Sequence, residues 1–288
     1  MAVLQMQRIS ICALKKDRKA ILERLQSLGT VEMNQIADDE AGFEKMDTLN
    51  ARLSFEKKAQ LSENALAVLD TYAPEKHSLL SSLEGKKLIG KDEFNQIISD
   101  KQQVISDANE LVALNKEIAE NKANILKLSN QIESLSPWLS LDVPMDFKGT
   151  KKAAMLLGTL AAGNTEETVY AAIAKHCPET EALDVQIVHS DKDAVYLVVF
   201  CLKEQETAVE EALRAAGFAR PSQLAEKMPA EKKADLEAEI KKLNMRNSLN
   251  EEEIRLLSQN RQKIQAVGDY FRMRASKYEL LGTLPQSQ

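Results

Sequence analysis

The hydrophobic positions near the start of the chain change their spacing within thirty residues. Ile9, Ile11 and Ala13 alternate with Arg8, Ser10 and Cys12, a pattern that predicts a half-buried strand. The next apolar residues lie on one face of a predicted helix: Ile21, Leu22, Leu25 and Leu28. Gly29 follows them and is suited to end this helix. An extended pattern resumes from Val31 to Met33. We therefore expect a β-α-β lobe, which is incomplete because two strands and one helix bury too little surface to be stable alone.

Long helical patterns follow Asp38-Asp39-Glu40. Residues 44–72 are rich in helix formers up to Pro74, and residues 78–90 have the composition of a turn. From a predicted N-cap at Asp92, one helical pattern continues to Ser136, directly before Pro137. Its apolar residues are Ile97, Val104, Leu111, Leu114, Ile118, Ile125, Leu128, Ile132 and Leu135. From Leu111 onward these residues keep heptad spacing, with Asn121 in a position where an apolar residue is missing.

A second heptad pattern lies near the C-terminus, where 55 residues between Pro229 and Pro285 contain no proline. Its apolar residues are Leu236, Ile240, Leu243, Ile254, Leu257, Ile264, Phe271 and Tyr278. Asn247, Asn250 and Arg261 interrupt the pattern. We interpret these three polar residues as register-setting or solvent-exposed, in preference to a binding role.

The segment between the two heptad patterns predicts a separate α+β lobe. Its order is β-α-β-β-α, with strands at 153–160, 185–189 and 195–202 and helices at 165–175 and 204–216. This order favours a ferredoxin-like sandwich. Because each heptad stripe must be buried, the two helical regions are expected to pack antiparallel on either side of this insert.

The predicted fold class is α+β, an elongated dumbbell with two small α/β lobes joined by a long antiparallel helical hairpin or bundle. Residues 1–40 with 279–288 form an incomplete proximal lobe in this interpretation. Residues 41–145 and 219–278 form a helical coiled-coil rod, and residues 146–218 form the distal lobe.

The composition of the chain supports long helices and argues against proteins that bind nucleic acid or insert into a membrane. Glycine and proline number only 10 and 7 in 288 residues, and aromatic residues make up 5%. A net charge of −6 argues against binding to nucleic acid or to anionic lipid. The longest apolar stretch, Ala194 to Leu202, is far shorter than the roughly 18 residues that cross a bilayer, so we expect no membrane insertion. Three cysteines and three histidines show no zinc-ligand spacing and indicate a reducing compartment: Cys12, Cys177, Cys201, His77, His176 and His189.

The clearest chemical motif is Gly158-Thr159-Leu160-Ala161-Ala162-Gly163-Asn164-Thr165. It has the glycine spacing of a phosphate-binding loop, but Asn164 replaces the lysine that would contact the phosphates. Asn164 followed by Glu167 also fits a helix N-cap with its reciprocal carboxylate. We favour the N-cap interpretation over nucleotide binding.

Other candidate residues favour structural interpretations. His176 and Cys177 are adjacent on a helix and therefore point in different directions, and His189 with Asp191 and Asp193 fits an exposed turn better than a metal site. The charge runs Glu251-Glu252-Glu253, Lys232-Lys233 and Lys241-Lys242 fit solvated helix faces. We therefore assign no catalytic, cofactor-binding or metal-binding residue, expect no cofactor, and do not expect an enzyme.

The order of several short motifs resembles the N-terminal cytoplasmic domain of subunit I of V-type ATPases and ATP synthases, called subunit a in eukaryotes. The opening motifs are Met6-Gln7-Arg8-Ile9-Ser10-Ile11 and Leu25-Gln26-Ser27-Leu28-Gly29-Thr30-Val31-Glu32. Leu135-Ser136-Pro137-Trp138, Leu141-Asp142-Val143-Pro144 and Gly149-Thr150-Lys151-Lys152 follow in the expected places. The resemblance covers essentially the whole chain.

The resemblance implies a non-catalytic stator component at the cytoplasmic face of the membrane. Its lobes would bind peripheral stalks built from subunits E and G while the complex transports protons or sodium ions. In the family a strand that completes the proximal lobe follows, and then a membrane domain whose arginine works with the proteolipid ring. This sequence ends at Leu284-Pro285-Gln286-Ser287-Gln288, so no ion-translocation residue is carried over. We expect residues 3–14 and 31–33 to exchange their amide protons fastest.

Two alternatives belong to other function classes. A generic coiled-coil tether or adaptor would self-associate through the rod, whereas a stator fragment would be largely monomeric. A nucleotide-binding enzyme would use the loop at residues 158–165 and would bind ATP with magnesium.

Overall fold

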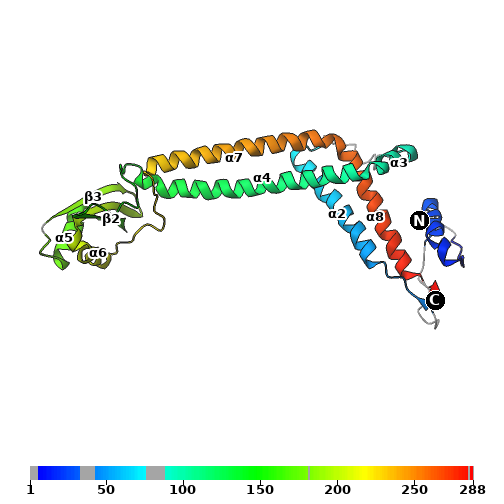
Figure 1. The fold of residues 1–288 in the computed structure, drawn as a ribbon, viewed down its shortest axis with the longest axis horizontal. Helices are drawn as coiled ribbons and strands as arrows, with labels where there is room; N and C mark the ends of the chain where they lie inside the picture. The colour runs from blue at the N-terminus through cyan, green and yellow to red at the C-terminus, as the bar shows by residue number, and fades with distance from the viewer. Residues whose placement is uncertain (1–5, 33–42, 76–87, 181, 285, 288) are drawn as a thin grey trace. The chain divides into compact units, whose positions relative to one another are not determined.

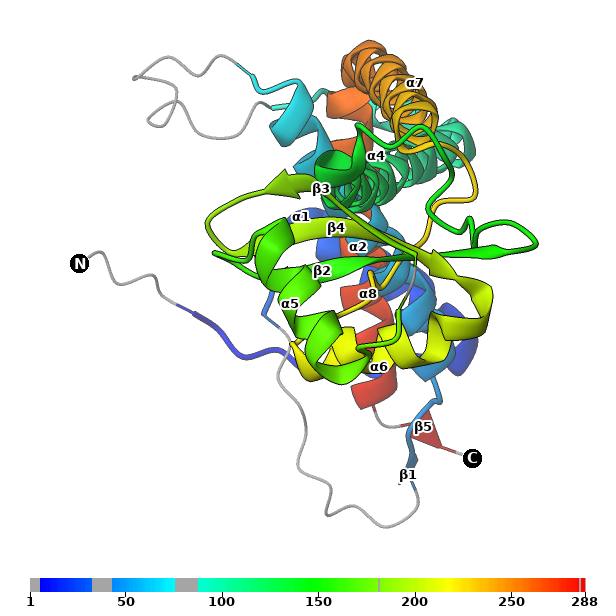
Figure 2. The ribbon, with the colours of Figure 1, turned by 90° about the vertical axis from the view of Figure 1, so that its left-hand side faces the viewer.

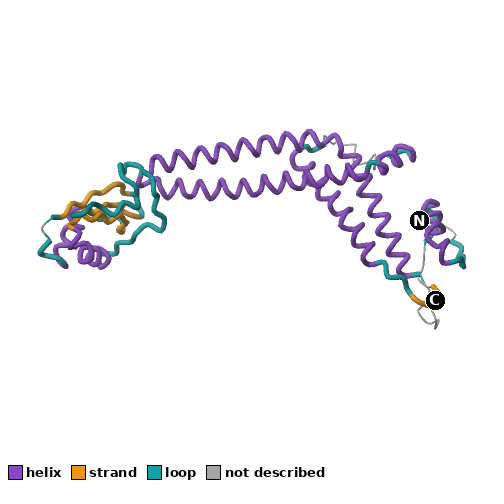
Figure 3. Tube along the Cα trace, viewed as in Figure 1, coloured by secondary structure: helices purple, strands orange, loops and turns teal. Residues whose placement is uncertain are grey.

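The computed structural model describes residues 6–32, 43–75, 88–180, 182–284 and 286–287 (Figures 1 and 3). The chain divides into two compact units, residues 1–117 with 249–288 and residues 118–248. Helices α4 (Lys101–Leu135) and α7 (Pro229–Leu257) each contribute residues to both units. Most described residues are helical, and strands are confined to one small sheet and one short pair (Figure 3).

The first unit is built mainly from α2 (Leu49–Tyr72) and α8 (Arg261–Thr283), which pack along their lengths. Its other elements are η1 (Lys15–Asp17), α1 (Arg18–Leu28), β1 (Phe43–Glu44), α3 (Lys91–Ser99), η4 (Ser258–Asn260) and β5 (Gln286–Ser287). Strands β1 and β5 form a two-stranded antiparallel pair. The helix predicted at residues 44–72 is confirmed, although it begins at Leu49.

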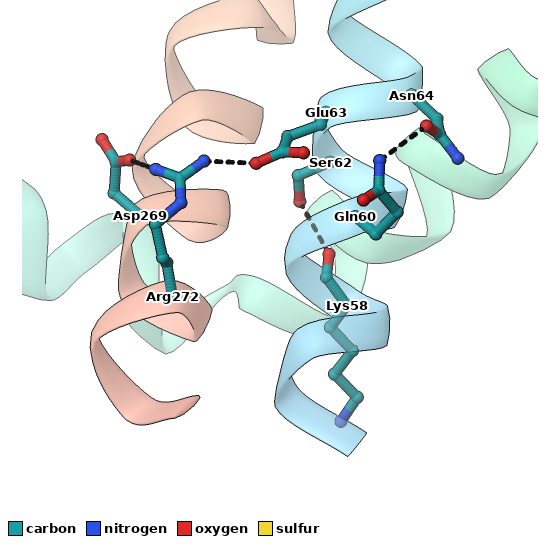
Figure 4. A network of polar contacts seen from close by, with 7 residues as sticks. All are labelled: Lys58, Gln60, Ser62, Glu63, Asn64, Asp269 and Arg272. Atoms are coloured by element: carbon teal, nitrogen blue, oxygen red, sulfur yellow. Dashed lines mark hydrogen bonds and ion pairs between the residues drawn. The ribbon is translucent and has the colours of Figure 1, made fainter. Parts of the chain in front are cut away.

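Small residues let α2 and α8 approach each other closely. Ser62 is fully buried, and a Cβ added at Gly268 would lie 3.0 Å from the Ser62 Cβ. Figure 4 shows the polar contacts beside this crossing, where Arg272 of α8 bonds both Glu63 of α2 and Asp269 of its own helix. The Ser62 hydroxyl donates to the Lys58 carbonyl at 3.2 Å, which satisfies its only polar group within its own helix. The two helices are thus joined by close apolar packing with ion pairs at its margin.

Both long helical predictions are interrupted in the structure. The first is split at Asp100 into α3 and α4, and its N-cap is Gly90 instead of the predicted Asp92, which lies in the first turn. The second is split by η4 into α7 and α8. The η4 turn is held because Asn260 Nδ2 donates to Asp107 Oδ2 at 2.9 Å. Periodicity did not reveal these breaks because neither contains a proline or a glycine.

Arg261 follows the η4 turn and explains one interruption of the heptad pattern. Its guanidinium donates to the Ala73 carbonyl at 2.7 Å and pairs with Asp70, so it caps the C-terminal end of α2. A cation at a helix C-terminus is stabilised by the unpaired carbonyls there. Arg261 therefore joins two helices, which agrees with the prediction that it does not form part of a binding site.

The predicted N-terminal strand is wrong. Residues 6–14 carry no strand, and Ile9 and Ile11 are 67% and 56% exposed. The alternating pattern needs a neighbouring strand to pair with, and the described residues offer none beside this segment. Val31 is likewise outside any strand, while Met33 and the predicted turn at residues 78–87 lie outside the described residues. The helix ending at Gly29 is confirmed, since Gly29 has φ of 64° at the end of α1.

The second unit contains a three-stranded antiparallel sheet in the order β2-β4-β3. The strands are β2 (Ala153–Ala161), β3 (Leu183–Ser190) and β4 (Ala194–Leu202). Its helices are α5 (Glu166–His176) and α6 (Glu206–Ala215), with the short turns η2 (Ser136–Trp138) and η3 (Lys203–Gln205). The predicted β-α-β-β-α order is confirmed within a few residues at each boundary.

The sheet has apolar residues on both faces. Helices α5 and α6 cover one face, as Figure 2 shows. The core under these helices contains Leu156, Leu160, Val169, Ile173, Leu197, Val199, Val209, Leu213 and Phe218. The other face packs against Trp138, Met145 and the adjoining ends of α4 and α7 through Leu135 and Leu236. Strand β4 therefore reads as an almost continuous apolar run.

The strand order agrees with the ferredoxin-like prediction, with one difference. A fourth strand beside β2 is reduced to a single bridge between Thr159 and Ala219, whose amides and carbonyls bond at 2.8 and 3.0 Å. The α+β fold class predicted from the sequence is confirmed. The finer division into proximal lobe, rod and distal lobe stays a prediction.

Candidate interaction surfaces

Gly158 is the first glycine of the motif at residues 158–165, which has the glycine spacing of a phosphate-binding loop. It lies inside strand β2 and not in a loop. A Cβ at this position would lie 2.3 Å from the Phe218 ring and 2.6 Å from the Ala219 carbonyl oxygen. The glycine therefore makes room for the segment that returns beside β2. This packing accounts for Gly158 without a bound phosphate.

The start of α5 is capped by its own side chains. Thr165 is the N-cap, its Oγ1 accepting from the Thr168 amide at 3.3 Å while Thr168 Oγ1 accepts from the Thr165 amide at 2.9 Å. The predicted N-cap at Asn164 with Glu167 is therefore wrong by one residue. Asn164 donates instead to the Ala161 carbonyl at 2.8 Å and accepts from Thr168. The capping interpretation holds for this turn, because amides at its helix terminus already have acceptors.

His176 and Cys177 do not form a pair at the end of α5. His176 is exposed in the last turn, and Cys177 is the C-cap residue. The Cys177 thiol donates to the Ala208 carbonyl at 3.2 Å, which links α5 to α6. The position of Cys177 is thus explained by helix packing.

The turn between β3 and β4 uses Asp191 as a backbone acceptor. Asp191 Oδ1 accepts from the Asp193 and Ala194 amides, both at 2.8 Å, and these bonds hold the pKa of Asp191 below its usual range. His189 instead lies against the Tyr196 ring, with centroids 5.7 Å apart. Burial raises the pKa of Tyr196, and the Asp191 charge adds to that shift. In the part of the chain that the structure describes, no three His, Cys, Asp or Glu side chains converge as a metal site would require.

Both edges of the sheet are occupied by local contacts. On the β3 edge, Tyr170 Oη accepts from the Val185 amide at 3.0 Å and Glu166 accepts from the Ile187 amide at 3.5 Å. On the β2 edge, the Lys148 carbonyl accepts from the Met155 amide at 3.2 Å, and Ala219 pairs further along. These contacts protect the strands from pairing with another chain. The periodicity of α5 gave no indication that Tyr170 and Glu166 have this role.

Glu210 of α6 fixes the segment that leaves the lobe. Its two carboxylate oxygens accept from Arg220 Nε and Nη2 at 2.9 and 2.8 Å, and Arg214 contacts the same carboxylate at 2.7 Å. The bond to Arg220 is the main reason that the pKa of Glu210 lies below its usual value. A bidentate pair of this kind fixes orientation as well as distance.

The charge runs of α7 behave mostly as solvated helix faces. Lys233 pairs with Glu237 and Glu251 pairs with Arg255, both at the i,i+4 spacing. Glu253 is an exception, because it lies against Glu110 of α4. The pKa of Glu110 is raised chiefly by burial and further by a hydrogen bond with Glu253. The charge pattern of α7 did not indicate this contact between helices.

In the first unit, α1 contacts α8 through charge. Lys277 is only 3% exposed, and its ammonium bonds Glu23 of α1, which also lies near Arg274. This bond is the largest cause of the lowered pKa of Glu23. Arg274 lies over the Phe55 and Tyr278 rings at 5.4 and 5.7 Å. The buried Lys277 ammonium, paired with the Glu23 carboxylate, is therefore one of the contacts that hold α1 against α8.

No helix within the described ranges combines the length and the apolar character needed to cross a membrane. No family model matches the chain, and no curated protein matches it. A solved structure does match, that of the cytoplasmic N-terminal domain of subunit I, homologue of subunit a, of V-ATPase. The match has a TM-score of 0.51 and 14% sequence identity, and covers 93% of this chain and 85% of that chain. In its fold the chain is therefore similar to this V-ATPase domain, and the resemblance predicted from the sequence is confirmed.

Proposed function

We propose that the chain is a non-catalytic stator component of a rotary V-type ATPase or ATP synthase, acting at the cytoplasmic face of the membrane. The observation that carries this proposal is the structural likeness to the V-ATPase subunit I domain, which extends over 93% of the chain. A role without catalysis is supported by the structural roles of three candidate residues. Gly158 makes room for Phe218, the Cys177 thiol bonds the Ala208 carbonyl, and Asp191 accepts from backbone amides of its own turn.

The helices suit the transmission of force. Helix α4 has 35 residues, about 50 Å of length at 1.5 Å per residue, and α7 has 29. Their buried faces carry Val104, Leu111, Ile118 and Ile254 in the heptad positions. Bending such a helix disturbs many packed contacts together, so it resists deformation.

The partners in this proposal are peripheral stalks formed by E–G heterodimers, which contact the chain through its lobes. The proximal lobe is residues 1–40 with 279–288, the rod is residues 41–145 with 219–278, and the distal lobe is residues 146–218.

Sedimentation velocity with and without purified E–G heterodimer tests the proposal. We expect the chain alone to sediment as a monomer and to form a faster, stoichiometric complex when E–G is added. Self-association of the chain without E–G binding would favour the coiled-coil tether instead. Calorimetric titration with ATP and magnesium is the second arm, and micromolar affinity would overturn the non-enzymatic assignment.

A further inference from the structure

Four exposed lysines gather at one end of the β2-β4-β3 sheet, where β2 begins and β4 ends. We name this group the lysine corner; it consists of Lys148, Lys151, Lys152 and Lys203. The register places Ala153 opposite Leu202, so Lys152 and Lys203 leave neighbouring strands side by side. Lys152 and Lys203, 51 positions apart in the sequence, thus share one end of the sheet, which the sequence pattern did not reveal.

The backbone of the lysine corner is fixed by hydrogen bonds. The Thr150 amide donates to the Ala153 carbonyl at 2.7 Å, which closes a turn with Lys151 and Lys152 at its tip. The Lys203 amide donates to the Lys152 carbonyl at 2.9 Å, and the Lys148 carbonyl accepts from Met155. Because these bonds involve only main-chain atoms, the four side chains remain available to a partner.

The ammonium groups of the lysine corner have no carboxylate partner within 4.0 Å among the described residues. Asp146 and Glu204 are neighbours in the sequence, yet neither forms an ion pair with a corner lysine there. By contrast, Arg214 and Arg220 of the same lobe are both paired with Glu210. The four unpaired cations therefore form a local positive field.

The rest of the lobe has the opposite charge. Residues 146–220 contain twelve acidic and eight basic residues, and half of the basic ones belong to the lysine corner. An acidic lobe is repelled by an extended polyanion such as a nucleic acid or an anionic bilayer. A compact acidic segment of a protein can instead contact the lysine corner while avoiding the acidic remainder.

We propose that the lysine corner is a docking surface for an acidic segment of a protein partner. This inference rests on the proposed function, in which the partner is the peripheral-stalk E–G heterodimer. The sheet edges are occupied by Tyr170, Glu166 and Ala219, so the partner binds through side-chain charge and not by adding a strand. The contact is electrostatic and weakens as salt screens it.

The test compares two variants of the full chain for binding to purified E–G heterodimer. The first is Lys148→Glu with Lys151→Glu, Lys152→Glu and Lys203→Glu. The second, a control, is Lys192→Glu in the β3–β4 turn at the opposite end of the sheet, about 30 Å away over nine strand residues. All substituted side chains are exposed, and thermal melts check that the lobe remains folded. Binding is measured at low and at physiological salt, and vesicles containing phosphatidylserine are a separate probe.

We expect the fourfold variant to weaken E–G binding by about tenfold or more and to lose most of its salt dependence, with Lys192→Glu close to the unmodified chain. Unchanged binding by a folded fourfold variant would show that the lysine corner is not the docking surface, but it would leave the proposed function intact. Absence of E–G binding by the unmodified chain would overturn both. Lysine-dependent binding to the vesicles, without lysine-dependent binding to E–G, would replace the protein partner with a membrane.

Discussion

Asn121 Nδ2 donates a hydrogen bond to Asn247 Oδ1 at 2.9 Å, although the two residues are 126 positions apart in the sequence. Both side chains are buried between α4 and α7. The bond joins one polar atom of each amide, in a seam that also contains the buried Asn250 but is otherwise lined by apolar residues such as Ile118 and Ile254. Such a pair specifies which residues face each other, and it does so at some cost in stability.

Replacing both asparagines by leucine is expected to raise the melting temperature. The double variant Asn121→Leu with Asn247→Leu removes two buried amides together, and similar-sized apolar groups fill their space. Either single variant leaves the other amide buried without its partner, so each single variant should be less stable than the double variant. Thermal melts of all three check this, and a lowered melting temperature in the double variant would contradict the seam assignment.

Asn250 offers a simpler case of the same kind. It is fully buried, and neither atom of its amide has a hydrogen-bond partner among the described residues. Asn250→Leu therefore removes a buried polar group without breaking a bond, and should raise the free energy of unfolding by about 1–2 kcal/mol. Urea denaturation measures this change. A destabilised Asn250→Leu variant would show that the amide is bonded in solution, for instance through water.

The sequence predicted most helical segments and the β-α-β-β-α order of residues 153–216 well, because their signals are local. Strand β4, for example, is an almost continuous apolar run, as expected of a strand that is buried on both faces. Gly29 and Gly217 have positive φ and mark the ends of helices. The heptad spacing likewise located the buried positions Leu111, Ile118 and Ile254.

The N-cap errors at Asp92 and Asn164 are local, but the larger failures share a physical cause, because they depend on contacts between residues distant in the sequence. The break at η4 is stabilised by Asp107, which is 153 positions from Asn260. The strand predicted around Ile9 and Ile11 needs a partner strand that local alternation cannot supply. The lysine corner and the Glu210–Arg220 pair also arise only from the tertiary arrangement.

Gly158→Ala is expected to destabilise the lobe by about 2–3 kcal/mol, because the new Cβ would overlap the Phe218 ring and the Ala219 carbonyl. Gly163→Ala is the comparison, since nothing lies within 4 Å of its Cβ and only its φ of +87° opposes the change. It should cost about 1 kcal/mol. Urea denaturation of both variants checks the order, and equal losses would mean that packing against Phe218 is not the reason for the glycine.

Glu210 should contribute stability at neutral pH that acid removes. Its folded-state pKa is lowered, chiefly by the bond to Arg220, so the contribution is present above the ordinary pKa of 4.5 and is lost as the pH falls through the lowered value. At pH 7 Glu210→Gln should lower the free energy of unfolding by about 1 kcal/mol, and below the lowered pKa the difference should vanish. Melting temperatures from pH 7 to pH 2.5 measure this. The exposed neighbour Glu211, changed to Gln, should have little effect at any pH, and an equal effect of both variants would contradict the role of Arg220.

Glu110 should show the opposite pH dependence. Its folded-state pKa is raised by partial desolvation, by the hydrogen bond with Glu253 and by the charges of Glu253 and Asp107. The folded chain therefore binds this proton more tightly than the unfolded chain, and stability increases as the pH falls through the raised pKa toward 4.5. Glu110→Gln keeps a donor for Glu253 and removes one negative charge, so it should raise the melting temperature at pH 7, with the gain shrinking toward pH 4.5. Exposed Glu133 on the same helix, changed to Gln, is the control. A Glu110→Gln curve parallel to that of the unmodified chain would mean that folding does not raise the pKa of Glu110.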